Sequence, residues 1–150
     1  KKIVDIKKVL TIADNGIDYY FKYPSLPVID KYGSIYITAD KQLLKFNRAG
    51  IFRGNLYQSG LGPGELNNLM DIFIQQDFLV AFNWSPCKLL WFSQKKNKLF
   101  KETRISQKIG WSNFLTFYAN KYFFFKESFP QTKNKAVFVP IRIRYSRQYE

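Results

Sequence analysis

The sequence predicts an all-β protein made of small four-stranded antiparallel sheets that repeat along the chain. Three observations support this prediction: many aromatic residues, short apolar runs separated by tight turns, and the return of that pattern at a regular interval. The 150 residues include 15 Phe, 10 Tyr and 3 Trp. Aromatic and β-branched side chains favour pleated, half-buried surfaces, whereas no segment shows a sustained helical period.

The first set of strands is predicted between residues 28 and 52. The apolar runs are Val28–Asp30, Ser34–Ile37, Leu43–Phe46 and a fourth run that begins at Ile51. The short segments between them contain Gly, Asp and Asn, which are the residues that tight turns favour. Because the turns are only a few residues long, consecutive strands are expected to pair antiparallel as hairpins.

The same pattern returns twice, with strands predicted at 72–74, 78–82, 88–92 and 99–100, then at 114–117, 122–125 and 137–145. Aligning Ile35, Phe78 and Tyr122 gives offsets of 43 and 44 residues. Four strands per repeat of this length are typical of β-propeller blades. We therefore expect about three blades, at 26–66, 67–110 and 111–150. Residues 1–25 are expected to form an outer strand or the remnant of a preceding blade.

Two stretches resemble the repeats of bacterial NHL-type six-bladed β-propellers. They are Phe46-Asn47-Arg48-Ala49-Gly50-Ile51-Phe52 and the connection Gly60-Leu61-Gly62-Pro63-Gly64-Glu65-Leu66. The resemblance covers about residues 26–100, and the full glycine signature occurs once. It implies a ring that binds ligands on one face, in a protein exported to the periplasm or held at the cell surface as a lipoprotein. Six blades need roughly 250 residues at this period, so a partial propeller, as a fragment, is expected.

The glycine-rich connection has two possible roles. A phosphate-binding loop follows a strand, opens a helix and carries Lys-Ser/Thr or a further glycine at set spacing. Here no lysine follows the glycines, and the next apolar run is a predicted strand. We therefore expect a structural turn formed by Gly60, Gly62, Pro63 and Gly64. Glu65 is expected to accept backbone N–H groups of that turn or, alternatively, to contact a ligand.

The formal net charge is +13, and residues 101–150 contribute +7 of it. Arg142 and Arg144 share one face of a predicted strand, and basic side chains interleaved with aromatic ones can bind nucleic acid. The alternative is a solvated outer strand whose charges protect a sheet edge. Trp84 and Trp111 lie in connecting segments and are further ligand-binding candidates, although packing within a blade is the favoured interpretation of both.

Catalytic chemistry has little support in the sequence. The absence of histidine excludes His-based catalysis and imidazole metal sites, and no cofactor or metal site is predicted. The stretch Asp14-Asn15-Gly16-Ile17-Asp18 lacks the ligand pattern of a calcium loop and is interpreted as a turn. Cys87, the single cysteine, has no base nearby in sequence and is expected to be an inert thiol.

Three classes of function therefore stay open. The first is a non-catalytic module that recognises a protein, peptide or glycan through one ring face. The second is a nucleic-acid-binding propeller that uses the basic C-terminal third. The third, which the resemblance suggests, is a lyase or hydrolase whose catalytic residues lie outside this chain. No apolar run approaches the roughly 20 residues that span a bilayer, so no transmembrane segment is predicted.

Overall fold

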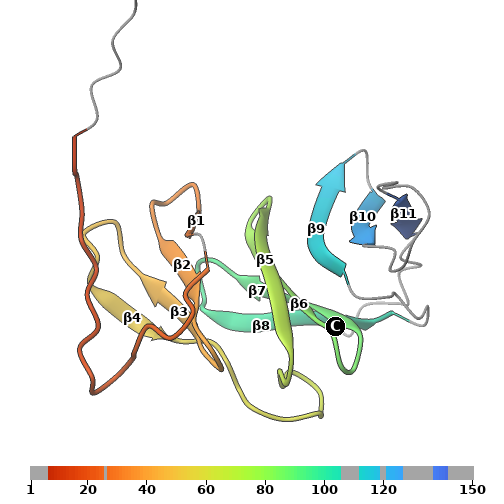
Figure 1. Ribbon diagram of the computed structural model, residues 1–150, viewed down its shortest axis with the longest axis horizontal. Coiled ribbons are helices and arrows are strands. Elements are labelled where there is room, and N and C mark those ends of the chain that lie inside the picture. Colours follow the sequence, from red (N-terminus) through yellow and green to blue (C-terminus); the bar gives the residue numbers. More distant parts are fainter. Residues whose placement is uncertain (1–6, 26, 106–111, 119–120, 127–136, 142–150) are drawn as a thin grey trace, which may run out of the picture. The chain divides into compact units, whose positions relative to one another are not determined.

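A computed structural model describes residues 7–25, 27–105, 112–118, 121–126 and 137–141, with side-chain surroundings up to residue 105. The chain divides into two compact units, residues 1–56 and residues 57–150. Every regular element among the described residues is a β-strand, and the strands form three antiparallel sheets (Figure 1). The predicted all-β class is confirmed.

The first unit contains a four-stranded sheet, in the order β1-β2-β3-β4. Its strands are β1 (Val28–Ile29), β2 (Ile35–Thr38), β3 (Leu43–Phe46) and β4 (Phe52–Asn55). Asp30 closes the first hairpin, because its Oδ1 accepts the N–H groups of Tyr32 and Ser34 at 2.9 and 2.8 Å. The other carboxylate oxygen accepts the hydroxyl of the buried Tyr36 at 3.0 Å. A buried aspartate thus ties the turn to the sheet core.

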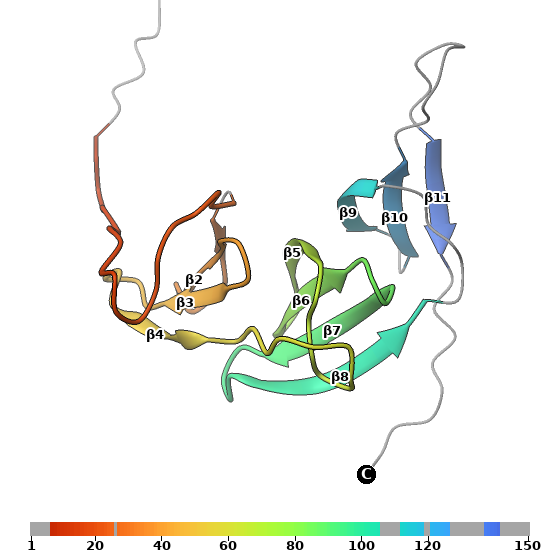
Figure 2. The same ribbon diagram turned by 60° about the horizontal axis from the view of Figure 1, so that its bottom comes forward.

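The segment before this sheet is irregular where the structure describes it. Residues 1–25 are predicted to form an outer strand or the remnant of a preceding blade, and residues 7–23 contain no strand. Residues 1–6 lie outside the described residues. Asn15 Oδ1 accepts three successive N–H groups, those of residues 17 to 19. Because these N–H groups bind a side chain, they are not available for hydrogen bonds to a neighbouring strand. The aromatic ring of Tyr19 packs edge-on against Phe46 at 5.1 Å. Side-chain packing therefore anchors this segment beside the first sheet (Figure 2).

The second unit contains the longer sheet, in the order β5-β6-β7-β8 (Figure 2). Its strands are β5 (Leu69–Gln75), β6 (Phe78–Asn83), β7 (Lys88–Ser93) and β8 (Lys98–Arg104). The middle strands β6 and β7 are almost wholly buried, whereas the outer strand β8 is partly exposed. One core cluster consists of Val80, Phe82, Leu89 and Trp91.

A β-bulge recurs at the same place in both four-stranded sheets. In the first sheet Lys45 pairs with Gly54 and Phe46 with Phe52, so Arg53 has no partner in the ladder. In the second sheet Trp91 pairs with Lys101 and Phe92 with Leu99, so Phe100 occupies the same position. Such bulges bend an edge strand and hinder pairing with another chain. The repeat seen in the sequence therefore extends to an irregularity of the backbone.

A third sheet follows in the order β11-β10-β9. It contains β9 (Ser112–Tyr118), β10 (Lys121–Lys126) and β11 (Val137–Ile141). The continuation of the last strand through residues 142–145, as predicted, lies outside the described residues. The exact blade boundaries stay a prediction.

Candidate functional site

The glycine-rich connection forms a type II β-turn before β5. The N–H of Glu65 donates to the carbonyl of Gly62 at 3.2 Å, so Pro63 and Gly64 occupy the two central positions. Proline at the first central position and a residue with positive φ at the second define this turn type, and Gly64 has a φ of 76°. The turn type therefore accounts for Pro63 and Gly64 in the sequence Gly-Pro-Gly-Glu.

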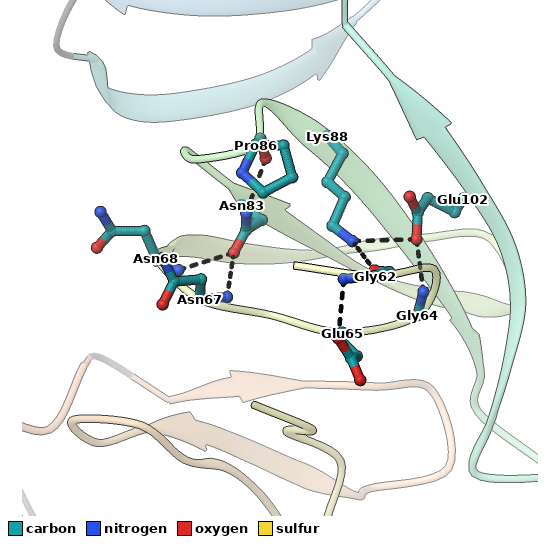
Figure 3. Close-up of polar contacts among 9 residues, drawn as sticks. All are labelled: Gly62, Gly64, Glu65, Asn67, Asn68, Asn83, Pro86, Lys88 and Glu102. Atoms are coloured by element: carbon teal, nitrogen blue, oxygen red, sulfur yellow. Dashed lines mark hydrogen bonds and ion pairs between the residues drawn. The ribbon is translucent and has the colours of Figure 1, made fainter. Parts of the chain in front are cut away.

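Glu65 folds back onto the same turn (Figure 3). Its Oε2 accepts the N–H of Gly62 at 2.8 Å. A Cβ atom at Gly60 would overlap this carboxylate, and one at Gly62 would lie 3.0 Å from Oε2. Gly60 and Gly62 therefore make room for the carboxylate, and of the expected roles for Glu65 the structure shows the contact with backbone N–H.

An ion pair between a buried lysine and a partly buried glutamate fixes the turn to the second sheet (Figure 3). The side chain of Lys88 is fully buried, and its Nζ donates to the carbonyl of Gly62 at 2.8 Å and to Glu102 Oε2 at 3.2 Å. The same Glu102 oxygen accepts the N–H of Gly64 at 2.6 Å. Both charges are thus paired and hydrogen-bonded, which is the condition for burying them.

Asn83 holds the residues that follow the turn. Its fully buried side chain accepts the N–H groups of Asn67 and Asn68, each at 2.9 Å, and donates to the carbonyl of Pro86 at 2.7 Å (Figure 3). The amide therefore joins the start of β5 to the turn between β6 and β7. Both polar atoms of the buried Asn83 amide are themselves hydrogen-bonded by these contacts, as buried polar side chains generally are.

These contacts leave the connection unsuited to phosphate. An anion-binding loop presents several N–H groups to the ligand. Here the N–H groups of Gly62 and Gly64 bind the chain's own carboxylates, and the N–H of Gly60 binds the carbonyl of Leu66 at 3.0 Å. The cation at the turn, Lys88, is already bound to the Gly62 carbonyl and to Glu102.

Two of the predicted ligand-binding residues, Glu65 and Trp84, lie in the described part of the second unit. Trp84 is half-buried in the turn after β6, and its ring packs edge-on against Phe82 at 6.4 Å. Packing thus involves this side chain, and its binding role stays a prediction. Trp111, Arg142 and Arg144 lie outside the described residues, so the structure brings no ligand set together from this list.

Cys87 lies beside Trp84 in the same turn and also packs against the core cluster. Burial raises the pKa of its thiol to about 11. The reactive thiolate is therefore scarce at neutral pH. Among residues whose positions are described, no group of His, Cys, Asp or Glu side chains could hold a metal ion. The stretch Asp14–Asp18 is a turn in which Asp14 Oδ1 accepts the N–H of Gly16 at 2.6 Å.

Sequence reasoning missed Lys88, Glu102 and Asn83. A weak signal was present, since Lys88 is the one charged residue at the head of the apolar run Lys88–Phe92. Its partner could not be identified from sequence, because Glu102 lies 14 residues away on the next strand. The pairing depends on the register in which Leu90 lies opposite Glu102.

Small four-stranded antiparallel sheets that follow one another along the chain are the units of which β-propellers are built. A family model described as 6-bladed beta-propeller matches residues 22–144, and the chain belongs to this family. No curated protein matches the chain.

Among solved structures, the chain is similar to a Bacteroides fragilis protein that is inferred to be exported. The TM-score is 0.56 and the sequence identity is 16%, so the similarity concerns the fold. The match covers 87% of this chain and 34% of that protein, so the chain spans about a third of its length. The described part of the chain contains no helix that is long and apolar enough to cross a membrane.

Proposed function

We propose that the chain is part of a non-catalytic, NHL-like propeller module that binds a protein, peptide or glycan and acts after export from a bacterial cell. The observation that carries the proposal is that the charged side chains at the glycine-rich connection are bound to its backbone. Glu65, Lys88 and Glu102 bind the connection's own backbone. Groups held in this way stabilise a rigid scaffold, and their position is accounted for by the fold without a role in proton transfer.

The compartment and the repeat type rest on similarity. The structural neighbour from Bacteroides fragilis is inferred to be exported, and the Gly-Pro-Gly-Glu turn follows the pattern of NHL-type repeats. Periplasmic or cell-surface localisation is therefore the proposal. Fractionation of the source bacterium with an antibody against this chain tests it, and recovery in the cytoplasm would contradict it.

Binding is tested by presenting the immobilised chain to a glycan array, a peptide library, heparin and single-stranded RNA over a series of salt concentrations. The proposal predicts binding to a glycan or peptide with weak salt dependence. The net charge of +13 favours a nucleic-acid ligand as the second candidate. RNA binding that weakens steeply as salt rises would support that candidate and overturn the first. Turnover of a small substrate would instead show an enzyme.

A further inference from the structure

One corner of the first unit carries two exposed tyrosines, Tyr20 and Tyr23, on a backbone that is held in place. The side chains are 43% and 85% exposed. They lie just before the isolated bridge between Pro24 and Ala39, beside the hairpin that joins β2 to β3. Neither ring belongs to the core clusters of this unit.

Buried polar groups fix the backbone on both sides of these rings. The Nε2 of the buried Gln42 donates to the carbonyl of Tyr20 at 2.8 Å, and its Oε1 accepts the N–H of Tyr20 at 3.4 Å. After the second ring, the N–H of Ser25 donates to the carbonyl of Thr38 at 2.8 Å, and the Ser25 hydroxyl oxygen accepts the N–H of Thr38 at 3.0 Å. The rings therefore project from an ordered segment.

Tyr23 is also held in an unusual backbone conformation. Its φ of 53° is in the left-handed region, which bulky residues rarely adopt. The three other non-glycine residues with positive φ among those described are Asp40, Gln76 and Asn97, which are small or polar turn residues. Packing does not compensate for this conformation, since the ring is largely exposed. The Lys22 ammonium lies 5.9 Å from the centroid of the Tyr23 ring. A strained backbone under a largely exposed ring is a reason to look for a function there.

The hydrogen-bond acceptors and the charges near Tyr20 and Tyr23 indicate which class of ligand could bind there. Asp40 Oδ2 accepts the Tyr20 hydroxyl at 3.2 Å, and the carboxylate keeps acceptor capacity for further donors. Asp14 Oδ2 accepts the N–H of Phe21 between the two tyrosines at 3.1 Å. With Asp18 there are three carboxylates in these segments against two lysines, Lys22 and Lys41, and the Lys22 ammonium lies 5.9 Å from the Tyr23 ring centroid. These segments therefore lack the excess of cations that a polyanion needs.

We infer that Tyr20, Tyr23 and Asp40 form a binding site for a neutral saccharide. The aromatic faces would stack on the C–H face of a sugar ring, and Asp40 would accept a hydrogen bond from a hydroxyl group. Ordered tyrosines contribute contact area at a low cost in conformational entropy. The inference rests on the proposed binding function and specifies its ligand class.

The test is native affinity electrophoresis of the full chain in gels that contain soluble neutral polysaccharides: an α-glucan, a β-glucan, a xylan and a mannan. We expect at least one polysaccharide to retard the chain. Tyr23→Ala and Tyr20→Ala should each weaken this binding about tenfold. Tyr20→Phe, which keeps the ring but loses the bond to Asp40, should weaken it less. The matched control is Tyr32→Ala, at the opposite hairpin, where Tyr32 is 47% exposed; it should leave binding unchanged.

Several results would overturn the inference. They are retardation by none of the four polysaccharides, equal retardation of Tyr23→Ala and the parent chain, and retardation only by heparin. A large fall in unfolding midpoint for Tyr23→Ala would show a packing role and would also overturn it. If the immobilised chain captures a peptide with the same affinity in all variants, the saccharide inference is wrong but the proposed binding function stands. Failure of every ligand class would contradict both.

Discussion

The buried pair between Lys88 and Glu102 allows the sharpest test of the fold. Lys88→Met keeps most of the side-chain volume but removes the charge and both donated bonds. Each hydrogen bond to a charged group contributes about 1.5–3 kcal/mol, and breaking a buried pair costs about 3–5 kcal/mol. Glu102 retains the N–H of Gly64, and the carbonyl of Gly62 retains the N–H of Glu65. We therefore expect a loss near the lower limit, about 3 kcal/mol.

The free energy of unfolding is measured by urea titration with tryptophan fluorescence, because all three tryptophans belong to the second unit. The matched control is Lys101→Met, on the neighbouring strand, where the ammonium lies over the Trp91 ring at 5.3 Å. It should lose about 1 kcal/mol or less. In the double variant Lys88→Met/Glu102→Gln no uncompensated charge is left, so the loss should be smaller than the sum of the two single losses. Equal losses for Lys88→Met and Lys101→Met would refute the reasoning.

Three further predictions concern the turn, the thiol and the buried tyrosine. Gly64→Ala should lower the unfolding free energy by about 1–2 kcal/mol, because φ is 76° and a Cβ would lie 3.1 Å from Leu99 Cδ2; an unchanged urea midpoint would contradict the turn assignment. At pH 8 Cys87 should react with a disulfide reagent about a hundredfold more slowly in the folded than in the unfolded chain. The reason is that burial raises the pKa of its thiol from 9.0 to about 11. Equal rates would show an exposed thiol. Burial and the bond to Asp30 raise the pKa of Tyr36, so its contribution to stability is present below about pH 10 and is lost as pH rises further. Tyr36→Phe should lower the free energy of unfolding by about 1–2 kcal/mol at pH 7 and remove this part of its decrease at alkaline pH. The measurement is unfolding followed by tyrosine circular dichroism. A decrease at alkaline pH as steep as in the parent chain would contradict this.

The strands could be predicted from sequence because their signals are local. Alternation of apolar residues and the turn residues between them located β3, β6 and β7 within a residue or two. Phe46 and Phe92, each the last residue of a predicted strand, occupy equivalent positions in the two sheets, each next to a bulge. The bulges themselves could not be predicted, because an extra residue in an edge strand leaves the alternation of a short, half-exposed run ambiguous.

The segment before the first sheet shows the opposite case. It is predicted to be an outer strand or the remnant of a preceding blade. Over residues 7–23 the chain forms no strand, and the bonds to Asn15 and the packing of Tyr19 on Phe46 favour an irregular path. Two of the candidate ligand residues from the sequence, Glu65 and Trp84, have structural contacts in the described chain. The exposed pair Tyr20 and Tyr23 was not singled out from the sequence. Its backbone is held by Gln42, and the Tyr20 hydroxyl is bound by Asp40, and both residues reach Tyr20 only when the hairpin between β2 and β3 has formed.

The sequence by itself determined the all-β class, the repeat and the turn chemistry of Gly62-Pro63-Gly64-Glu65, because each depends on residues that are close along the chain. Only the tertiary structure decided that Lys88 and Glu102 hold this turn and that two tyrosines form an ordered, exposed corner. These contacts join residues 14 to 38 positions apart. Such distances are closed by strand register and sheet twist, which no short stretch of sequence specifies.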